Sequence, residues 1–244
     1  MEILYQDKEI VVCVKPVGVS SEDGDNSLPA LLRKELGSEI FPLHRLDLNV
    51  GGVMVYARTK TAAARLSKAI QDGAMVKEYR CLVHGAPPQS GDWQDLLWKD
   101  SSKNKVFVVK RMRKGVKNAR LEFQRLTEGE TSLVHVRLHT GRSHQIRVQF
   151  ASRGFPLVGD HKYGSRDEAT APMLYSCRIT FPHQGKTQVF EHYPDWGNAE
   201  QLTADGIPSA VRLSMTAAQQ SPSLKSEPLY CPYLSRKNDH VVIL

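Results

Sequence analysis

The segment that most constrains this chain is residues 42–58, where an acid lies between an apolar stretch and a pair of glycines. The acid is Asp47, the glycines are Gly51 and Gly52, and residues 53–57 are Val-Met-Val-Tyr-Ala, a run typical of a buried strand. Glycine adopts backbone angles that side chains forbid, so the chain can turn sharply there or approach another group closely. A carboxylate on a loop supported by a buried strand is a common arrangement for a reactive site. Taken alone, however, the segment is better explained by a solvated turn or a helix cap.

Three further segments change this interpretation. The most informative lies far downstream, in residues 138–164, and the others lie near the start of the chain and around residue 79. Together with the first segment they resemble the RluA-type pseudouridine synthases, enzymes that isomerise uridine within RNA. The resemblance spans residues 2–192, in order and at plausible spacing, and rests on these residues: Ile3-Leu4-Tyr5, Val14-Lys15-Pro16-Val17-Gly18, His44-Arg45-Leu46-Asp47, Gly52, Lys77-Glu78-Tyr79, Val83-His84-Gly85, Thr140-Gly-Arg-Ser-His-Gln-Ile-Arg147, Gly159-Asp160 and Tyr163-Gly164.

The resemblance implies a role for four residues. Asp47 is similar to the family's catalytic carboxylate, and Tyr79 to its active-site tyrosine, which offers a flat face to the uracil and a hydroxyl for proton transfer. Arg147 matches the arginine that contacts the carboxylate. Arg45 matches the arginine that fills the space left when the target base is turned out of its stack, although a structural salt bridge is an open alternative.

The chain departs from the usual family pattern in three places. Val50 and Gly51 stand where the family usually has Thr-Ser, Ser143 stands where Thr is usual, and Gln149 stands where His is common. Replacing two hydroxyl residues by an apolar side chain and a glycine leaves fewer hydrogen-bonding groups around the loop that carries Asp47. The departure concerns the exact positioning of Asp47 and not the presence of the acid itself.

The implied reaction breaks an N-glycosidic bond, rotates the base and joins the same sugar carbon to a ring carbon. Bonds are exchanged without net oxidation or hydrolysis, so we expect no cofactor. A carboxylate can attack the sugar, attack the pyrimidine ring or remove a sugar proton, and the sequence does not choose among these routes. Asp47 must stay ionised in a site that excludes water, which requires a cation beside it; this is the role implied for Arg147.

The charge of the chain points to a polyanionic partner. Lysine and arginine total 33 against 26 acids, a net charge of +7, which suits RNA as well as it suits solubility alone. The densest cluster lies in residues 110–117 and includes Arg111, Arg113 and Lys114; it is either a solvated turn or a finger that binds phosphates, and we favour the finger. Arg142, just before a short predicted helix, is a further candidate phosphate contact.

Period-two and helical patterns favour an α+β fold with a mixed, mostly antiparallel sheet, flanking helices and a central active-site cleft; the resemblance makes this the pseudouridine synthase catalytic fold. Ser27, Thr59 and Ser143 are the predicted helix caps, with a stripe of leucines at 28, 31, 32 and 36 facing the core. Residues 106–109 and 119–123 are predicted to be antiparallel strands around the basic turn. The catalytic domain is expected over residues 1–196, followed by a weakly ordered tail over 197–244 rich in Ser, Pro, Gln and Ala.

We expect a cytoplasmic monomer. Three of the four cysteines, Cys13, Cys81 and Cys177, lie in apolar, strand-like settings, as reduced core residues do; the fourth is Cys231. No apolar run approaches membrane-spanning length, and the first residues lack the basic start of a signal peptide, so no membrane association is expected.

Two other functions fit part of the pattern. An RNA-binding protein that kept the fold and lost activity is suggested by Val50 and Gly51. A metal-dependent hydrolase is suggested by His135, His139 and His144, but the first two lie on the polar face of a predicted strand and no nearby acid completes a ligand set. We therefore expect no metal.

Overall fold

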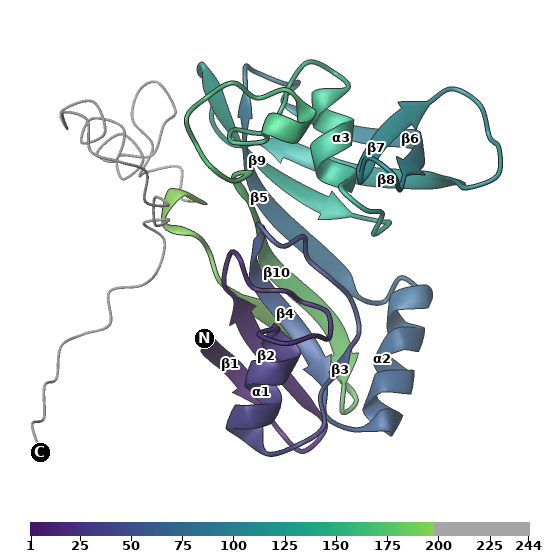
Figure 1. Cartoon of the computed structure of the whole chain (residues 1–244), viewed down its shortest axis with the longest axis vertical. Coiled ribbons are helices and arrows are strands. Elements are labelled where there is room, and N and C mark those ends of the chain that lie inside the picture. Colours follow the sequence, from purple (N-terminus) through teal and green to yellow (C-terminus); the bar gives the residue numbers. More distant parts are fainter. Residues whose placement is uncertain (198–244) are drawn as a thin grey trace, which may run out of the picture.

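The computed structural model describes residues 1–197, which form one large sheet with helices packed on it (Figure 1). The 11-stranded sheet has the order β1-β2-β4-β10-β5-β9-β8-β6-β7, with β11 beside β10 and β3 beside β4. Except for Gly197, the predicted tail lies outside the described residues. The strands are β1 (Glu2–Gln6), β2 (Ile10–Lys15), β3 (Phe41–Pro42), β4 (Gly51–Ala57), β5 (Val76–His84), β6 (Ser90–Asp100), β7 (Lys105–Val109), β8 (Val116–Arg125), β9 (Thr131–Leu138), β10 (Leu174–His183) and β11 (Lys186–Glu191). The α-helices are α1 (Leu28–Leu36), α2 (Lys60–Gln71) and α3 (Gln145–Ala151), and the 3-10 helices are η1 (His161–Tyr163) and η2 (Asp195–Gly197).

The glycine pair starts β4 where this strand meets β10. Their pairing is parallel, with Gly51 opposite Tyr175 and Gly52 opposite Ser176. Gly52 has a φ of +123°, and a Cβ atom there would lie 2.2 Å from the carbonyl oxygen of Ser176. Close approach of the two backbones therefore requires glycine at this position, which explains one of the two glycines after Asp47.

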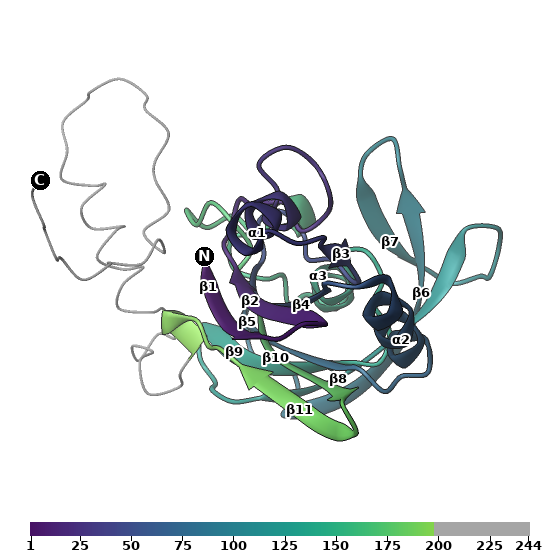
Figure 2. The same cartoon turned by 90° about the horizontal axis from the view of Figure 1, so that it is seen from below.

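Strand β4 is buried on both faces, as its continuous apolar run predicts. Its seven residues are all buried. One face, with Met54 and Tyr56, packs in the same core as α1, α3 and the Asp47 loop, whereas the other, with Val53 and Val55, packs against α2. In Figure 2 the sheet curves around α1 and α3. Helices α1 and α3 and the Asp47 loop thus form a layer on the inner face of the curved sheet, and this layer contains the candidate site.

The predicted caps of the first two helices are confirmed. The Ser27 hydroxyl accepts a hydrogen bond from the Ala30 N–H at 3.2 Å, and the Thr59 hydroxyl accepts one from the Ala62 N–H at 3.1 Å. The stripe predicted for α1 is wrong at Leu31, which is 41% exposed because it lies on the outer side of the helix. No α-helix within residues 1–197 is long and apolar enough to cross a membrane.

The pairing predicted around the basic turn is wrong. β7 and β8 do not pair with each other; both pair with β6, which lies between them. Polar residues along β6, such as Asp92 and Lys99, obscured its alternation in the sequence, so its eleven residues were not recognised as a strand. The segment between β7 and β8 is therefore a connection that passes across β6 (Figure 1).

The third predicted cap is also wrong. Helix α3 begins at Gln145, and its N-cap residue is His144, which has a φ of 51° and makes no side-chain cap. The Gln145 side chain instead holds the loop before α3, since its Oε1 accepts hydrogen bonds from the Arg142 N–H at 3.0 Å and from the Thr140 hydroxyl at 2.8 Å. The sharp turn at His144 directs its imidazole toward the loop of Asp47.

Candidate active site

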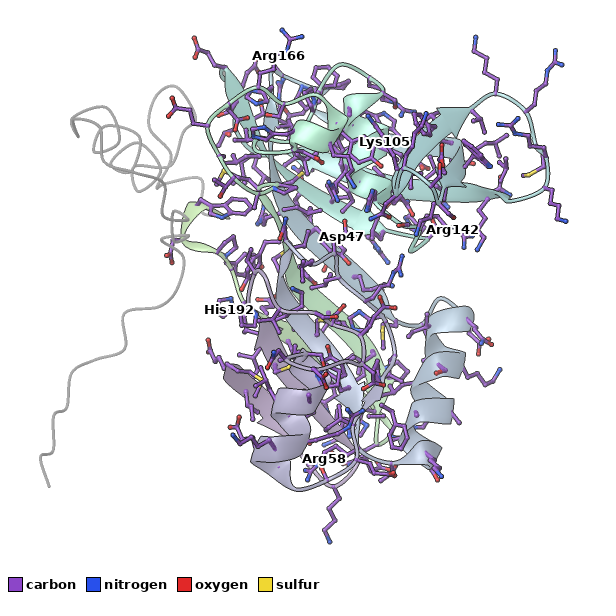
Figure 3. All side chains as sticks on the ribbon, in the orientation of Figure 1. Asp47, Arg58, Lys105, Arg142, Arg166 and His192 are labelled. Carbon is purple, nitrogen blue, oxygen red and sulfur yellow. The ribbon has the colours of Figure 1, made fainter. Side chains whose placement is uncertain are left out.

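Asp47 lies on the loop between β3 and β4, near the middle of the long axis of the molecule (Figure 3). Two hollows with volumes of about 470 and 800 Å³ meet there. Both are lined by Arg45, Asp47, Lys99 and Ser143, so they are two parts of one cleft. The predicted central cleft is thus present, with Asp47 in its wall.

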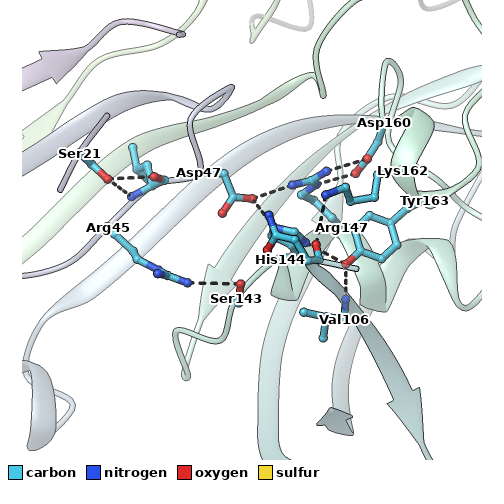
Figure 4. A network of polar contacts seen from close by, with 12 residues as sticks. Ser21, Arg45, Asp47, Val106, Ser143, His144, Arg147, Asp160, Lys162 and Tyr163 are labelled. Atoms are coloured by element: carbon cyan, nitrogen blue, oxygen red, sulfur yellow. Dashed lines mark hydrogen bonds and ion pairs between the residues drawn. The ribbon is translucent and has the colours of Figure 1, made fainter. Parts of the chain in front are cut away.

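The predicted contact between Asp47 and Arg147 is present. An Nη1 hydrogen of Arg147, on α3, is donated to Asp47 Oδ2 across 2.8 Å (Figure 4). Burial alone would lower the pKa of the guanidinium, but hydrogen bonds to the carboxylates of Asp160 and Asp47 outweigh burial and raise its pKa above the usual value. Arg147 therefore stays charged and supplies the cation that an ionised Asp47 needs.

Asp160 completes this ion cluster and was not among the residues selected from the sequence. Its carboxylate accepts hydrogen bonds from Arg147 Nε at 2.7 Å and Nη2 at 2.9 Å, and its side chain is 1% exposed. This two-pronged contact fixes the plane of the guanidinium and leaves Nη1 directed at Asp47. The Gly159-Asp160 pair of the distal segment was the signal that could have identified it.

Two buried side chains hold the backbone on either side of Asp47. The Ser21 hydroxyl accepts a hydrogen bond from the Leu46 N–H at 3.1 Å and donates one to the Leu46 carbonyl at 2.9 Å. The Lys15 ammonium, 1% exposed, donates to the Leu48 carbonyl at 3.1 Å and to two carbonyls of its own loop. Burial lowers the pKa of Lys15 to about 8, and the charge of Asp47 opposes this shift. These contacts position the loop without the hydroxyl residues that the family usually has before its last glycine.

We expect Ser21→Ala to lower both stability and turnover. The substitution leaves the Leu46 N–H and C=O buried without their partner, at a cost of about 1–3 kcal/mol per group. The melting temperature and kcat should both fall. The neighbouring Ser20→Ala is the matched control, because the Ser20 hydroxyl makes only exposed contacts with Glu22. Equal behaviour of the two variants would show that Ser21 does not hold the loop.

Two ionisable side chains near Asp47, those of Tyr79 and His144, are kept neutral. Tyr79, on β5, lines the larger hollow, and burial first and the charge of Asp47 second raise its pKa. His144 Nε2 lies 3.8 Å from Asp47 Oδ2, and burial lowers the pKa of His144 to about 4. Its Nδ1 is hydrogen-bonded to the Tyr163 hydroxyl at 2.9 Å, and the Tyr163 ring lies 5.2 Å from the Arg147 guanidinium (Figure 4). Sequence reasoning missed Tyr163 as well.

The predicted RNA-binding residues fall into two groups. Arg45 and Arg142 line the cleft: Arg45 Nη2 donates to the Ser143 hydroxyl at 3.3 Å, and Arg142 Nε donates to the Asn118 carbonyl at 2.8 Å. The other three lie on the exposed connection between β7 and β8, outside the lining of both hollows: Arg111, Arg113 and Lys114. One of these, Arg113, places its guanidinium 5.1 Å from the Trp98 ring.

The three histidines of the metal hypothesis have separate partners. His135 contacts Glu78 at 3.3 Å, His139 contacts Glu122 at 3.0 Å, and His144 faces Asp47. In the part of the chain that the structure describes, no three His, Cys, Asp or Glu side chains gather as metal ligands do. Each of the three histidines thus faces a different carboxylate, and the three rings do not converge on one point.

The site combines a mixed sheet with a part-buried carboxylate–guanidinium pair in a cleft lined by basic side chains. The family model described as RNA pseudouridylate synthase matches residues 9–152. The chain therefore belongs to the RNA pseudouridylate synthase family, which is a family of isomerases. This confirms the fold class and the family predicted from the sequence.

Curated relatives cover most of the chain. It is 32% identical to the dual-specificity RNA pseudouridine synthase RluA of Escherichia coli K12, over 80% of this chain and 93% of that protein. It is 30% identical to an uncharacterized RNA pseudouridine synthase of Aquifex aeolicus, and this match covers 78% of this chain and 68% of that protein. The ribosomal large subunit pseudouridine synthase D of Zymomonas mobilis is 29% identical, and the match spans 72% of this chain but only 60% of that protein.

Solved structures agree in fold. Human RNA pseudouridylate synthase domain containing 1 superposes with a TM-score of 0.72 at 21% identity, covering 92% of this chain and 96% of that one. Human RNA pseudouridylate synthase domain containing 4 superposes with a TM-score of 0.67 at 24% identity, covering 78% of this chain and 87% of that one. At these identities the likeness concerns the fold alone.

Proposed function

We propose that this chain converts uridine to pseudouridine within RNA and that Asp47 is the reacting carboxylate. The observation that carries the proposal is the part-buried ion pair: Arg147 reaches Asp47 Oδ2 from the other wall of the cleft, while Asp160 fixes the guanidinium. Among the described residues, the hydrogen bond of the Asp47 side chain falls on Oδ2, which leaves Oδ1 free to accept one from a ligand in the cleft. A charged, oriented oxygen facing an open cavity is what nucleophilic or proton-abstracting chemistry requires.

The target uridine would occupy the larger hollow. There the Tyr79 ring offers a face to the uracil, and its phenol keeps its proton because its pKa is raised. In the reaction the C1′–N1 bond breaks, a C1′–C5 bond forms, and the hydrogen leaves C5 while N1 gains a proton. Oδ1 of Asp47 is the starting point for all three routes, namely attack on the sugar, attack on the ring and removal of a sugar proton. The structural support of the loop by Ser21 and Lys15 favours an active enzyme over an inactive RNA-binding protein.

Structured RNA of the ribosome or transfer RNA is the substrate that we propose. The names of two relatives specify the large ribosomal subunit and dual specificity, and the net charge of +7 suits a polyanion. The base must leave its stack to reach the cleft, and Arg45, exposed at the mouth, is the residue that we place in the vacated space. We further propose that residues 1–196 act as the catalytic domain, with residues 197–244 as a tail, in a cytoplasmic monomer.

Mapping pseudouridines in cellular RNA tests this function. RNA from cells with and without the gene is compared by chemical modification and sequencing. We expect one or a few uridines of ribosomal or transfer RNA to lose the modification in the deletion and to regain it with the wild-type gene. Identical maps, with the protein shown to be expressed, would contradict the proposal.

The basic connection between β7 and β8 gives a separate prediction. If Arg111, Arg113 and Lys114 bind phosphates, neutralising them to Gln, Gln and Met should weaken RNA binding and flatten its salt dependence. Each contact contributes about 0.7–0.9 to the slope of log Kd against log salt. The control is the neutralisation of three exposed lysines elsewhere, Lys8, Lys34 and Lys60. An unchanged slope in the first variant would show that the cluster is only a solvated connection.

A further inference from the structure

Lys77 lies in the wall of the cleft on the strand that carries Tyr79. The two residues are two positions apart on β5, so their side chains lie on the same face, about 7 Å apart along the strand. Both line the larger hollow. The Lys77 ammonium lies against the chain at Gly141, where an added Cβ atom would be 3.2 Å from Nζ. Lys77 is therefore directed into the hollow that we assign to the target uridine.

The Lys77 ammonium has no carboxylate partner among the described residues. Burial lowers the pKa of Lys77, and among residues 1–197 no carboxylate forms an ion pair with its ammonium to offset this. The neighbouring His44 is neutral, since burial first and the charge of Lys77 second lower its pKa to about 3. Asp47 is the one carboxylate among the described residues that line this hollow, and it is already bound by Arg147.

Other cationic side chains line the same hollow, so positive charge exceeds negative charge there. They are Arg45, Lys99, Lys117, Arg137 and Arg142. A desolvated ammonium without a counter-ion is costly, so its presence is explained if a ligand supplies the missing charge. RNA carries such a charge at every nucleotide.

We propose that Lys77 binds one phosphodiester of the RNA backbone beside the uridine that lies against Tyr79. This site rests on the proposed function, because it assumes that the target base occupies the larger hollow. The contact would fix the register of the strand in the cleft and so help to decide which uridine reaches Asp47. It is distinct from the ion cluster of Asp47, Arg147 and Asp160.

Binding of a labelled 15-nucleotide oligouridylate tests the site without requiring turnover. Fluorescence anisotropy at several KCl concentrations is measured for the wild-type chain, Lys77→Met, Lys77→Arg and the control Lys60→Met, whose lysine is exposed at the start of α2. We expect Lys77→Met to weaken binding about tenfold at low salt and to lower the salt slope by about 0.7. Lys77→Arg should keep the slope, and Lys60→Met should match the wild type.

Thermal unfolding separates a binding role from a structural one. Lys77→Met removes a desolvated charge, so its Tm should equal or exceed that of the wild type although it binds RNA less well. A lower Tm with unchanged affinity would assign Lys77 a structural role and overturn the proposal. Unchanged affinity and slope with a lower kcat would also overturn it, because Lys77 would then act on the base.

A second probe locates the phosphate. Once a modified uridine is mapped, stem-loops with one methylphosphonate on its 5′ or 3′ side are compared. The wild type should lose affinity for one of these RNAs, and Lys77→Met should bind that RNA and the unmodified stem-loop equally well. Equal losses in both proteins would contradict the site. Failure of the wild type to form pseudouridine in the unmodified stem-loop would count against the proposed function alone.

Discussion

Asp47→Asn is expected to reduce pseudouridine formation by at least about 10⁴-fold while leaving the protein folded and able to bind RNA. The substitution keeps the shape of the side chain and removes the charge that every route requires. Arg147 retains its two hydrogen bonds to Asp160, so the more deeply buried ion pair of the cluster remains and the fold should be stable. Single-turnover conversion of a labelled RNA measures the loss.

The control for this variant is Asp25→Asn, which changes an exposed acid outside the cleft lining. It should convert RNA at the wild-type rate. Substantial residual turnover by Asp47→Asn would show that another group performs the chemistry. Loss of RNA binding together with turnover would show that the charge of Asp47 serves to organise the cleft.

Arg147→Ala is expected to destabilise the fold by about 3–5 kcal/mol and to lower activity severely. It leaves Asp160, whose side chain is 1% exposed, as a buried charge without its partner, and it frees Asp47 from its cation. Arg147→Lys should give intermediate activity, because it restores the charge without the planar two-pronged contact. Denaturant unfolding and kcat are the measurements.

A double variant separates the stabilising role of Arg147 from its catalytic role. Replacing both partners, as Arg147→Met with Asp160→Leu, removes the stranded charge and should recover much of the stability without recovering activity. Arg153→Ala is the matched control: Arg153 follows α3 and pairs with Asp95 at 2.9 Å away from Asp47, so activity should persist. Normal activity and stability of Arg147→Ala would refute the role given to the cluster.

The features that could be predicted from the sequence are those that depend on neighbouring residues or on the chemistry of a single side chain. Ser27 and Thr59 cap helices through bonds to residues three positions away. The need of an ionised Asp47 for a cation followed from chemistry, whereas the family resemblance named Arg147 as that cation. The glycine after Asp47 was recognised as a point of close approach, although its partner strand, β10, could not be named.

What the sequence did not predict depends on distant segments. The hydroxyl of Ser21 holds a residue 25 positions away, and nothing in its local pattern indicates this. The place of β6 between β7 and β8 is decided by side-chain pairing across the sheet, which a polar strand conceals. The lack of a counter-ion at Lys77 is visible only when the neighbours from β5 and the loop before α3 are assembled.

Release of tritium from RNA labelled at C5 of uridine tests the central claim most directly. Formation of the C1′–C5 bond expels the C5 hydrogen, so each conversion releases one tritium to water. With RNA from cells that lack the gene, the purified wild-type chain should release tritium equivalent to one or a few uridines per molecule and leave pseudouridine at those positions. No release by folded protein that binds this RNA would contradict the account.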